Sequence, residues 1–165
     1  MLYGDELNYT TKTSAIGQLV KAYEKNPGLI VGCQEVPQKE VCKYGAYKTD
    51  KKFDKNLFKV SGIVEKPNPG EEPSCIVGLG RYIMPENTFA YIKKQCKDTP
   101  INQELKLTDT MELIMKDTPS YAVIMDSIRY DTGDKLGYLK AVVEYGLRDK
   151  NLGKNFKKYL KDLKL

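Results

Sequence analysis

Apolar and polar residues along this chain form two kinds of segment, typical of strands and of helices. Short apolar runs predict five strands, at Met1–Gly4, Leu29–Cys33, Leu57–Val64, Cys75–Met84 and Tyr121–Met125. The runs at Leu29–Cys33 and Tyr121–Met125 are continuous, which indicates strands buried on both faces. A loop rich in proline and glycine, Pro67–Pro73, precedes the fourth run.

Apolar residues at helical spacing predict helices between these strands. Each has a residue suited to its start, in chain order Thr13 or Ser14, Pro85, Thr108 and Asp134. The alternation of strands and helices favours an α/β fold. Because no segment has the length or composition of a linker, we expect residues 1–165 to form a single domain.

The segment 150–165 predicts an amphipathic carboxyl-terminal helix. Its six lysines and one acid account for the net charge of +5, so the rest of the chain is neutral. This distribution argues against a nucleic-acid-binding surface. Such a helix packs on its own domain or on a second subunit. Alternatively, it binds a membrane or an acidic partner.

The composition, 41% hydrophobic and 30% charged, is that of a folded globular protein. The chain has no histidine, which excludes Ser-His-Asp and Cys-His catalysis and a His-ligated zinc site within it. Its four cysteines form no Cys-x-x-Cys pair, so we expect free thiols in a reducing cytoplasm. Neither a membrane-spanning run nor a signal peptide is expected from the sequence.

Three short segments carry residues suited to chemistry with carboxylates, lysine and a hard cation. The first is Gly4-Asp5-Glu6, directly after the first apolar run. A carboxylate at the carboxyl end of a strand lies where α/β sheets place their ligands. Alternatively, Asp5 belongs to a turn or caps a helix.

The second segment is Val64-Glu65-Lys66-Pro67, where an acid and a base stand side by side at a strand end. Lysine suits a phosphate oxygen, and glutamate accepts hydrogen bonds from sugar hydroxyls. Because neighbours in a strand point to opposite faces, a bulge or turn is needed to bring both to one site. An exposed pair at the edge of a loop is the alternative.

The third segment, Asp131–Tyr138, places Asp131 before a glycine turn and Asp134 at a helix start. A carboxylate ahead of a helix start is a candidate ligand for magnesium, and the free amides of the helix favour anions. Alternatively, both aspartates only shape the turn and cap the helix. Asp5 and Asp131 are 126 positions apart, so only the fold brings them together.

Six sequence boxes occur in a familiar order along essentially the whole chain: Lys43-Tyr44-Gly45, Val64–Pro67, Gly80-Arg81-Tyr82, Glu104–Asp109, Asp131–Tyr138 and Val143–Arg148. The series resembles the carboxyl-terminal part of the bacterial UTP–glucose-1-phosphate uridylyltransferase (UDP-glucose pyrophosphorylase) family. The resemblance implies a Rossmann-like, mixed and mostly parallel sheet with flanking helices. It also implies a cytoplasmic, oligomeric enzyme that uses Mg²⁺ to form UDP-glucose and pyrophosphate from UTP and glucose 1-phosphate.

The resemblance also assigns residues. It implies that Asp5 and Asp131 bind the metal, that Glu65 contacts glucose and that Lys66 contacts the sugar phosphate. Asp5, Lys66 and Asp131 are thereby the expected catalytic residues. Gly45 is the glycine whose backbone lies against the sugar.

One departure from the family pattern limits this expectation. No glycine-rich loop followed by an arginine and a lysine, which binds the triphosphate in the family, occurs in the chain. We therefore expect a distal half of such an enzyme, inactive alone and prone to self-association. The alternatives are a non-catalytic module that binds a sugar phosphate or nucleotide sugar, and a thymidylyl- or guanylyltransferase.

Overall fold

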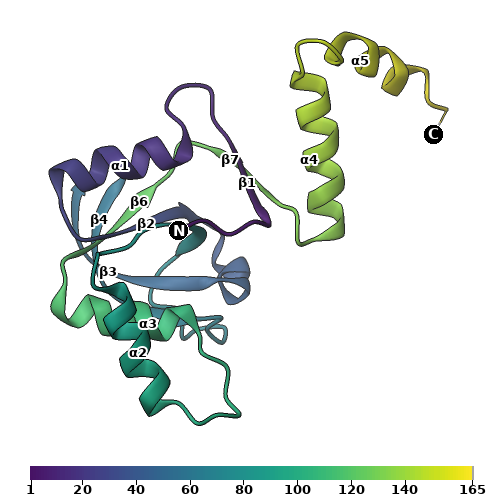
Figure 1. Cartoon of the computed structure of the whole chain (residues 1–165). Helices are drawn as coiled ribbons and strands as arrows, with labels where there is room; N and C mark the ends of the chain where they lie inside the picture. The colour runs from purple at the N-terminus through teal and green to yellow at the C-terminus, as the bar shows by residue number, and fades with distance from the viewer. Residues whose placement is uncertain (165) are drawn as a thin grey trace. The chain divides into compact units, whose positions relative to one another are not determined.

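The structure is a computed structural model, and it describes residues 1–164. It divides into two compact units. The first unit consists of Met1–Leu2 and Thr10–Ser127, and the second of Tyr3–Tyr9 and the chain from Ile128 onward. Each unit is described by itself below, and Figure 1 labels most of the elements of both.

Five strands of the first unit pair in a closed order, β2-β5-β3-β4-β6. Their bounds are β2 Leu29–Glu35, β3 Gly45–Asp54, β4 Leu57–Glu65, β5 Ile76–Ile83 and β6 Ser120–Ile124. Among the described strands only β2 and β6 pair in parallel, and the other pairs are antiparallel. The predicted mixed α/β fold is confirmed. The expectation of a mostly parallel sheet does not hold for the strands in this chain.

A short connection explains the antiparallel pairing of β3 with β4. Lys55 and Asn56 alone join β3 to β4, and a two-residue loop can only reverse the direction of the chain. The proline- and glycine-rich loop joins β4 to β5, which do not pair with each other but lie on either side of β3. Parallel pairing needs a longer crossover, and β2 and β6 are separated by most of the first unit.

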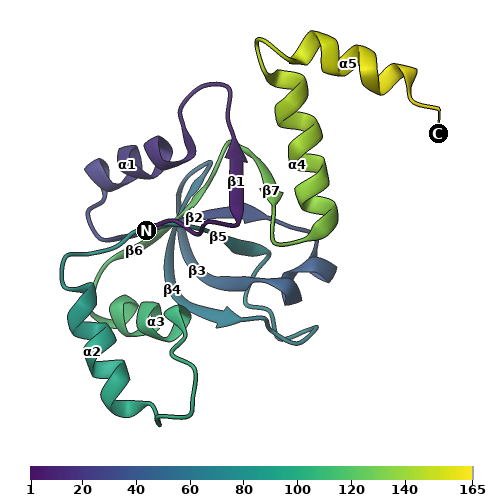
Figure 2. The same ribbon diagram turned by 45° about the vertical axis from the view of Figure 1, so that its right-hand side comes forward.

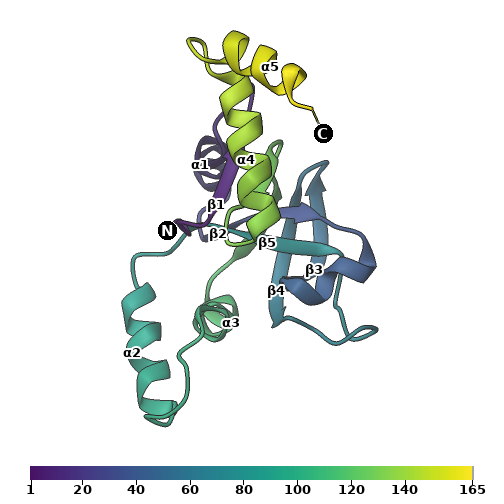
Figure 3. The same cartoon turned by 90° about the vertical axis from the view of Figure 1, so that its right-hand side faces the viewer.

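Helices of the first unit flank the strands (Figures 1 and 2). Their bounds are α1 Ala15–Lys25, the 3₁₀ helix η1 Gln38–Lys43, α2 Thr88–Asp98 and α3 Leu107–Asp117. α1 begins as predicted, because the Ser14 side chain accepts a hydrogen bond from the Gly17 amide at 3.2 Å. α3 packs against β4, and α2 packs against α3, which Figure 3 shows from the side.

The core of the first unit lies on both faces of β2. Leu29 and Val31 belong to the cluster that contains Met111 and Ile114 of α3. Ile30, which points to the opposite face, belongs to the cluster that contains Leu19 of α1. The predicted strand buried on both faces is therefore confirmed.

The second unit contains two strands and two helices. Their bounds are β1 Glu6–Tyr9, β7 Ile128–Asp131, α4 Lys135–Arg148 and α5 Gly153–Asp162. β1 and β7 pair antiparallel and lie side by side in Figure 2. The amphipathic helix predicted near the carboxyl terminus is α5. No helix within residues 1–164 has both the length and the apolar character needed to cross a membrane.

An aromatic cluster holds α4 to the strands of the second unit. The rings of Tyr9 and Tyr130 both contact the ring of Tyr145 edge-on. The Arg148 guanidinium lies over the Tyr9 ring, 4.3 Å from its centre, and donates to the Tyr130 hydroxyl at 3.1 Å. Burial, and next the neighbouring Tyr130, raise the pKa of Tyr145 above its usual range.

Candidate active site

The two aspartates predicted to bind metal lie next to each other in the second unit. Asp5 directly precedes β1, and Asp131 ends β7. In the pairing of these strands, Glu6 stands opposite Asp131. The Asp5 carbonyl oxygen accepts hydrogen bonds from the Thr132 amide at 2.8 Å and from its hydroxyl at 3.0 Å. The fold thus brings together two carboxylates that are 126 positions apart in the sequence.

The prediction of a strand at residues 1–4 was wrong. Leu2 forms only an isolated bridge with Arg81, while Gly4 and Asp5 form a turn. The strand of this region begins at Glu6, so Asp5 precedes a strand instead of following one. The physical reason is that residues 6–9 find a full partner in β7, whereas Met1 and Leu2 meet only the end of β5.

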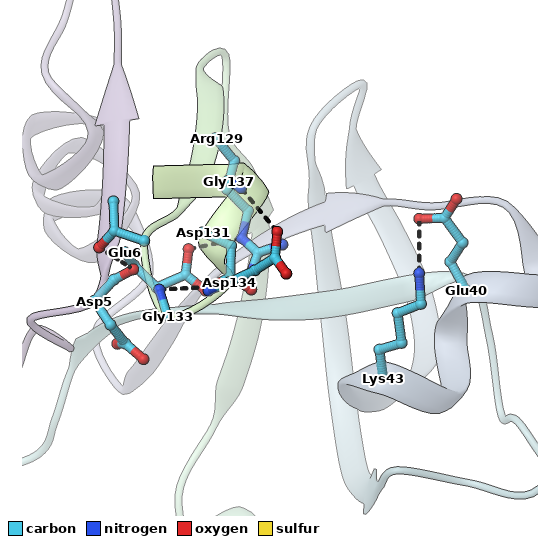
Figure 4. Close-up of polar contacts among 10 residues, drawn as sticks. Asp5, Glu6, Glu40, Lys43, Arg129, Asp131, Gly133, Asp134 and Gly137 are labelled. Carbon is cyan, nitrogen blue, oxygen red and sulfur yellow. Dashed lines mark hydrogen bonds and ion pairs between the residues drawn. The ribbon is translucent and has the colours of Figure 1, made fainter. Parts of the chain in front are cut away.

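A tight turn fixes the carboxylate of Asp131. Its Oδ1 accepts hydrogen bonds from the amides of Gly133 at 3.0 Å and Asp134 at 3.3 Å, as Figure 4 shows. A Cβ added to Gly133 would lie 3.2 Å from Asp131 Oδ1 and 3.3 Å from Asp5 Oδ2. Gly133 therefore leaves space beside both carboxylates, with Asp131 Oδ1 engaged by the two amides and Oδ2 left for other partners.

The start of α4 supports this turn. Asp134 caps the helix as predicted, because its carboxylate accepts a hydrogen bond from the Gly137 amide at 2.7 Å. A Cβ on Gly137 would lie 1.9 Å from the Asp131 carbonyl oxygen, so only glycine fits there. An open cavity of about 330 Å³, lined by Thr132, Gly133, Lys135 and other residues of this turn and helix, adjoins the site.

Arg129 joins Asp131 to a second acid. Its guanidinium donates to both carboxylate oxygens of Glu6, and the distance from Nε to Oε2 is 2.6 Å. Its Nη2 also donates to Asp131 Oδ2 at 3.1 Å. The side chains of Arg129 and Glu6 are each 11% exposed, whereas that of Asp131 is 41% exposed. Figure 4 shows these residues on neighbouring strands. Neither Arg129 nor Glu6 was predicted as a site residue.

The residues fit a hard divalent cation. Mg²⁺ prefers carboxylate oxygens and is bound through one or two carboxylates, with water and substrate phosphates completing the coordination. Asp5 and Asp131 supply two such groups. Within residues 1–164, no group of three or more acidic, cysteine or histidine side chains could hold a metal by itself. The pair therefore supplies two ligands of a metal whose coordination would be completed by water or by a substrate phosphate.

The other three predicted site residues form a cluster of their own, in the first unit. Gly45 begins β3 and pairs with Glu65, which ends β4. A Cβ on Gly45 would lie 3.0 Å from Glu65 Oε2, so glycine leaves space beside this carboxylate. The Lys66 amide donates to the Tyr44 carbonyl oxygen at 3.0 Å, which holds Lys66 at the same strand end.

Lys66 has a left-handed backbone, with φ at 47°. Among residues 1–164 it is the only residue other than glycine with positive φ. This conformation costs an L-residue about 1–2 kcal/mol. This turn ends the alternation of the strand directly after Glu65. The bulge or turn that the Glu65-Lys66 pair requires is therefore present, and strain of this kind is often found at functional sites.

We expect Lys66→Gly to be more stable than Lys66→Ala by about 1 kcal/mol, because glycine adopts positive φ without strain. Urea unfolding of the two variants measures this difference. The matched control is the same pair of substitutions at Lys59, an exposed position in the extended strand β4. There the order should reverse, with alanine more stable by roughly 0.5–1 kcal/mol. Equal stability of the two Lys66 variants would contradict the strain.

The cysteines take no part in either cluster. All four, Cys33, Cys42, Cys75 and Cys96, are free thiols, as predicted. Burial raises the pKa of the Cys33 thiol well above its usual range, so this group stays protonated and unreactive.

The comparison with known families decides the identity of the chain. The sequence pattern of the nucleotidyl transferase family matches residues 2–146. The chain belongs to this family. The match includes all five predicted site residues and both clusters described above.

Individual nucleotidyl transferases are similar to the chain over nearly its whole length. The UTP–glucose-1-phosphate uridylyltransferase of Staphylococcus haemolyticus is 36% identical over 99% of the chain. A UTP-bound UGPase from Acinetobacter baumannii has a TM-score of 0.87 and 28% identity, also over 99% of the chain. A UDP-glucose pyrophosphorylase complexed with UDP-glucose has a TM-score of 0.81 and 28% identity over 90% of the chain.

The resemblance to uridylyltransferases is thereby confirmed. The matched region makes up 55% of the staphylococcal protein, 55% of the Acinetobacter protein and 56% of the third. The chain therefore spans about half the length of the nucleotidyl transferases that it matches.

Proposed function

We propose that the chain supplies the metal-binding and sugar-phosphate-binding part of a UTP–glucose-1-phosphate uridylyltransferase. The observation that carries this proposal is the convergence of the Asp5 and Asp131 carboxylates beside Gly133. The relatives named above support it, because they are uridylyltransferases or UDP-glucose pyrophosphorylases. They favour this function over that of a non-catalytic binding module or a transferase for another base.

In the proposed reaction, a phosphate oxygen of glucose 1-phosphate attacks the α-phosphorus of UTP. A new P–O bond forms, the bond from the α-phosphorus to the oxygen that bridges to the β-phosphorus breaks, and pyrophosphate leaves with that electron pair. The chemical difficulty is to bring two polyanions together and to stabilise the charge on the transferred group. Mg²⁺, when bound, supplies part of this charge neutralisation.

Each predicted residue has a role that its position supports. Asp5 and Asp131 would hold the metal ion, and the turn around Gly133 keeps Asp131 in a fixed orientation. Glu65 would accept hydrogen bonds from sugar hydroxyls, in the space that Gly45 leaves open. Lys66 would neutralise the phosphate of the sugar as a point charge.

Self-association and a cytoplasmic location belong to the same proposal. Within the second unit, α4 and α5 form an apolar groove of about 450 Å³, lined by Val142, Gly146, Leu152, Asn155, Phe156 and Tyr159. An exposed apolar groove of this kind is suited to contact with another subunit. Sedimentation that gave only monomer at high concentration would contradict the oligomer. The cytoplasmic location stays an expectation from the composition.

We expect the 165-residue chain alone to form no measurable UDP-glucose from UTP and glucose 1-phosphate, because it contains no glycine-rich loop for the triphosphate. A hybrid enzyme, in which this chain replaces the matching region of the S. haemolyticus relative, should form UDP-glucose. Both are measured by release of pyrophosphate in the presence of Mg²⁺. The intact relative is the positive control.

Two outcomes would contradict the proposal. A soluble, folded hybrid that releases no pyrophosphate would show that the chain does not carry the residues of a working site. Tight binding of UDP-glucose by the chain alone, together with an inactive hybrid, would favour the non-catalytic binding module instead.

A further inference from the structure

We infer that Arg129 is a positioning residue which, with Glu6, sets how tightly Asp131 binds a divalent cation. The inference rests on the proposed function, because it concerns the metal-binding role of Asp131. Arg129 is not expected to touch the substrate or the metal. It acts through the single contact from its Nη2 to Asp131 Oδ2, at 3.1 Å.

The first step is the count of acceptor positions on Asp131. A carboxylate offers about four lone-pair directions to donors and metals. Oδ1 uses two for the amides of Gly133 and Asp134, and Oδ2 uses one for Arg129. One direction on Oδ2 remains for a cation. Arg129 and the cation therefore share one oxygen, and a stronger bond to Arg129 weakens the bond to the cation.

Glu6 decides how strongly Arg129 binds to that oxygen. Both oxygens of the Glu6 carboxylate accept hydrogen bonds from the Arg129 guanidinium. The negative charge of Glu6 thereby neutralises most of the positive charge of Arg129. The pair is largely buried, each side chain being 11% exposed, so the balance of charge between them is only weakly screened by solvent. Without Glu6, the whole positive charge of Arg129 would fall on Asp131.

The ion pair with Arg129 also keeps Glu6 from binding the metal. Glu6 and Asp131 are opposite each other on β1 and β7, where two like charges destabilise the pairing. Arg129 stabilises both carboxylates on this face and holds Glu6 in a two-pronged ion pair. Asp5 differs, because its side chain has no hydrogen-bond or ion-pair partner among residues 1–164. The two available ligands are therefore Asp5 and Asp131.

The inference predicts opposite changes in cation affinity for two variants of the whole chain. Glu6→Gln should weaken Mn²⁺ binding about tenfold, because Arg129 then binds Asp131 more strongly. Arg129→Met should tighten Mn²⁺ binding about fivefold, because Asp131 gains a lone pair and Glu6 is released. Titration of free Mn²⁺ followed by electron paramagnetic resonance measures both. Mn²⁺ is a suitable probe, since it takes the same oxygen ligands as Mg²⁺.

Three controls separate this role from a structural one. Arg129→Lys keeps the charge but cannot keep every contact of the guanidinium, so its Mn²⁺ affinity should lie between those of the wild type and Arg129→Met. Asp134→Asn removes one nearby charge that Arg129 does not contact, and should also change affinity by less than about threefold. Thermal unfolding monitors the fold, because breaking a buried ion pair lowers stability whichever partner is removed.

The outcomes distinguish the inference from the proposed function. If wild-type protein binds Mn²⁺ and Asp131→Asn abolishes binding, the metal assignment stands. With that result, the inference is wrong if Glu6→Gln and Arg129→Met shift the Mn²⁺ affinity in the same direction. It is also wrong if Arg129→Lys tightens Mn²⁺ binding as much as Arg129→Met does. Absence of Mn²⁺ binding by the wild-type chain, or an unchanged affinity in Asp131→Asn, overturns the metal assignment and the inference together.

Discussion

Asp131→Asn is expected to lower the kcat/KM of the hybrid enzyme for UTP and glucose 1-phosphate about a thousandfold. Asparagine is nearly the same size as aspartate, and its oxygen can still accept from the amides of Gly133 and Asp134. The substitution therefore preserves the turn but replaces the charged group that we propose as a metal ligand by a neutral amide. The initial rate of pyrophosphate release over a range of Mg²⁺ concentrations measures the loss.

Asp134→Asn is the matched control for this prediction. Asp134 lies three positions further along, is exposed, and caps α4 through the Gly137 amide. Asparagine is as good a helix cap as aspartate, so the structural role is kept while one negative charge is lost. Activity should remain within about threefold of the unsubstituted hybrid. A comparable loss in both variants would show that net charge, and not metal binding by Asp131, is responsible.

Lys66→Met is expected to lower kcat/KM of the hybrid about a hundredfold or more, because the sugar phosphate loses the positive charge of the lysine that would neutralise it. Methionine keeps much of the length of the side chain and removes only the ammonium group. Steady-state kinetics with glucose 1-phosphate as the varied substrate measures the effect. An interaction made with the ground state raises KM, whereas one made with the transition state lowers kcat.

Lys59→Met provides the comparison on the same strand. Lys59 is exposed in β4 and lies outside the cluster of Gly45, Glu65 and Lys66. Its substitution removes an equal charge and should leave the kinetics unchanged within about twofold. An unaffected Lys66→Met hybrid would remove Lys66 from the site and would leave its left-handed backbone without a functional reason.

Elements with strong local signals could be predicted from the sequence. Ser14 and Asp134 cap helices in the structure as they were expected to, and the apolar run at Leu29–Cys33 is the buried strand β2. The cap predicted at Thr108 was wrong, because the cap position is Lys106, two residues earlier, and α3 begins at Leu107. There Gln95 of α2 donates to the Lys106 carbonyl oxygen, a tertiary contact that local sequence does not reveal.

The strands that were missed have weak local signals. β3, at Gly45–Asp54, carries several lysines and is mostly exposed along its second half, so no apolar run marks it. β1 and β7 have four residues each and are stabilised by each other. β7 does alternate, with apolar Ile128 and Tyr130 between polar neighbours, but four residues are too few to distinguish a strand from a loop.

Candidate site residues could be named from the sequence, but their arrangement in space could not. The family resemblance supplied Gly45, Glu65, Lys66, Asp5 and Asp131 one by one, while composition alone indicated only carboxylate and lysine chemistry. Whether Asp5 meets Asp131 depends on the register of β1 with β7. The bridge from Arg129 to two acids depends on the same register, so no spacing rule could have indicated it.

The pairing of β1 with β7 has a consequence for the order in which the protein folds. About 120 residues separate the two strands, and closing a loop of that length costs roughly 4 kcal/mol in chain entropy. β1 must therefore wait, unpaired, until the ribosome has made the chain as far as β7. The first unit has its own core and can fold during that time. The pairing that places Asp5 beside Asp131 therefore forms only after the first unit can fold, and nascent chains that stop before residue 128 never possess it.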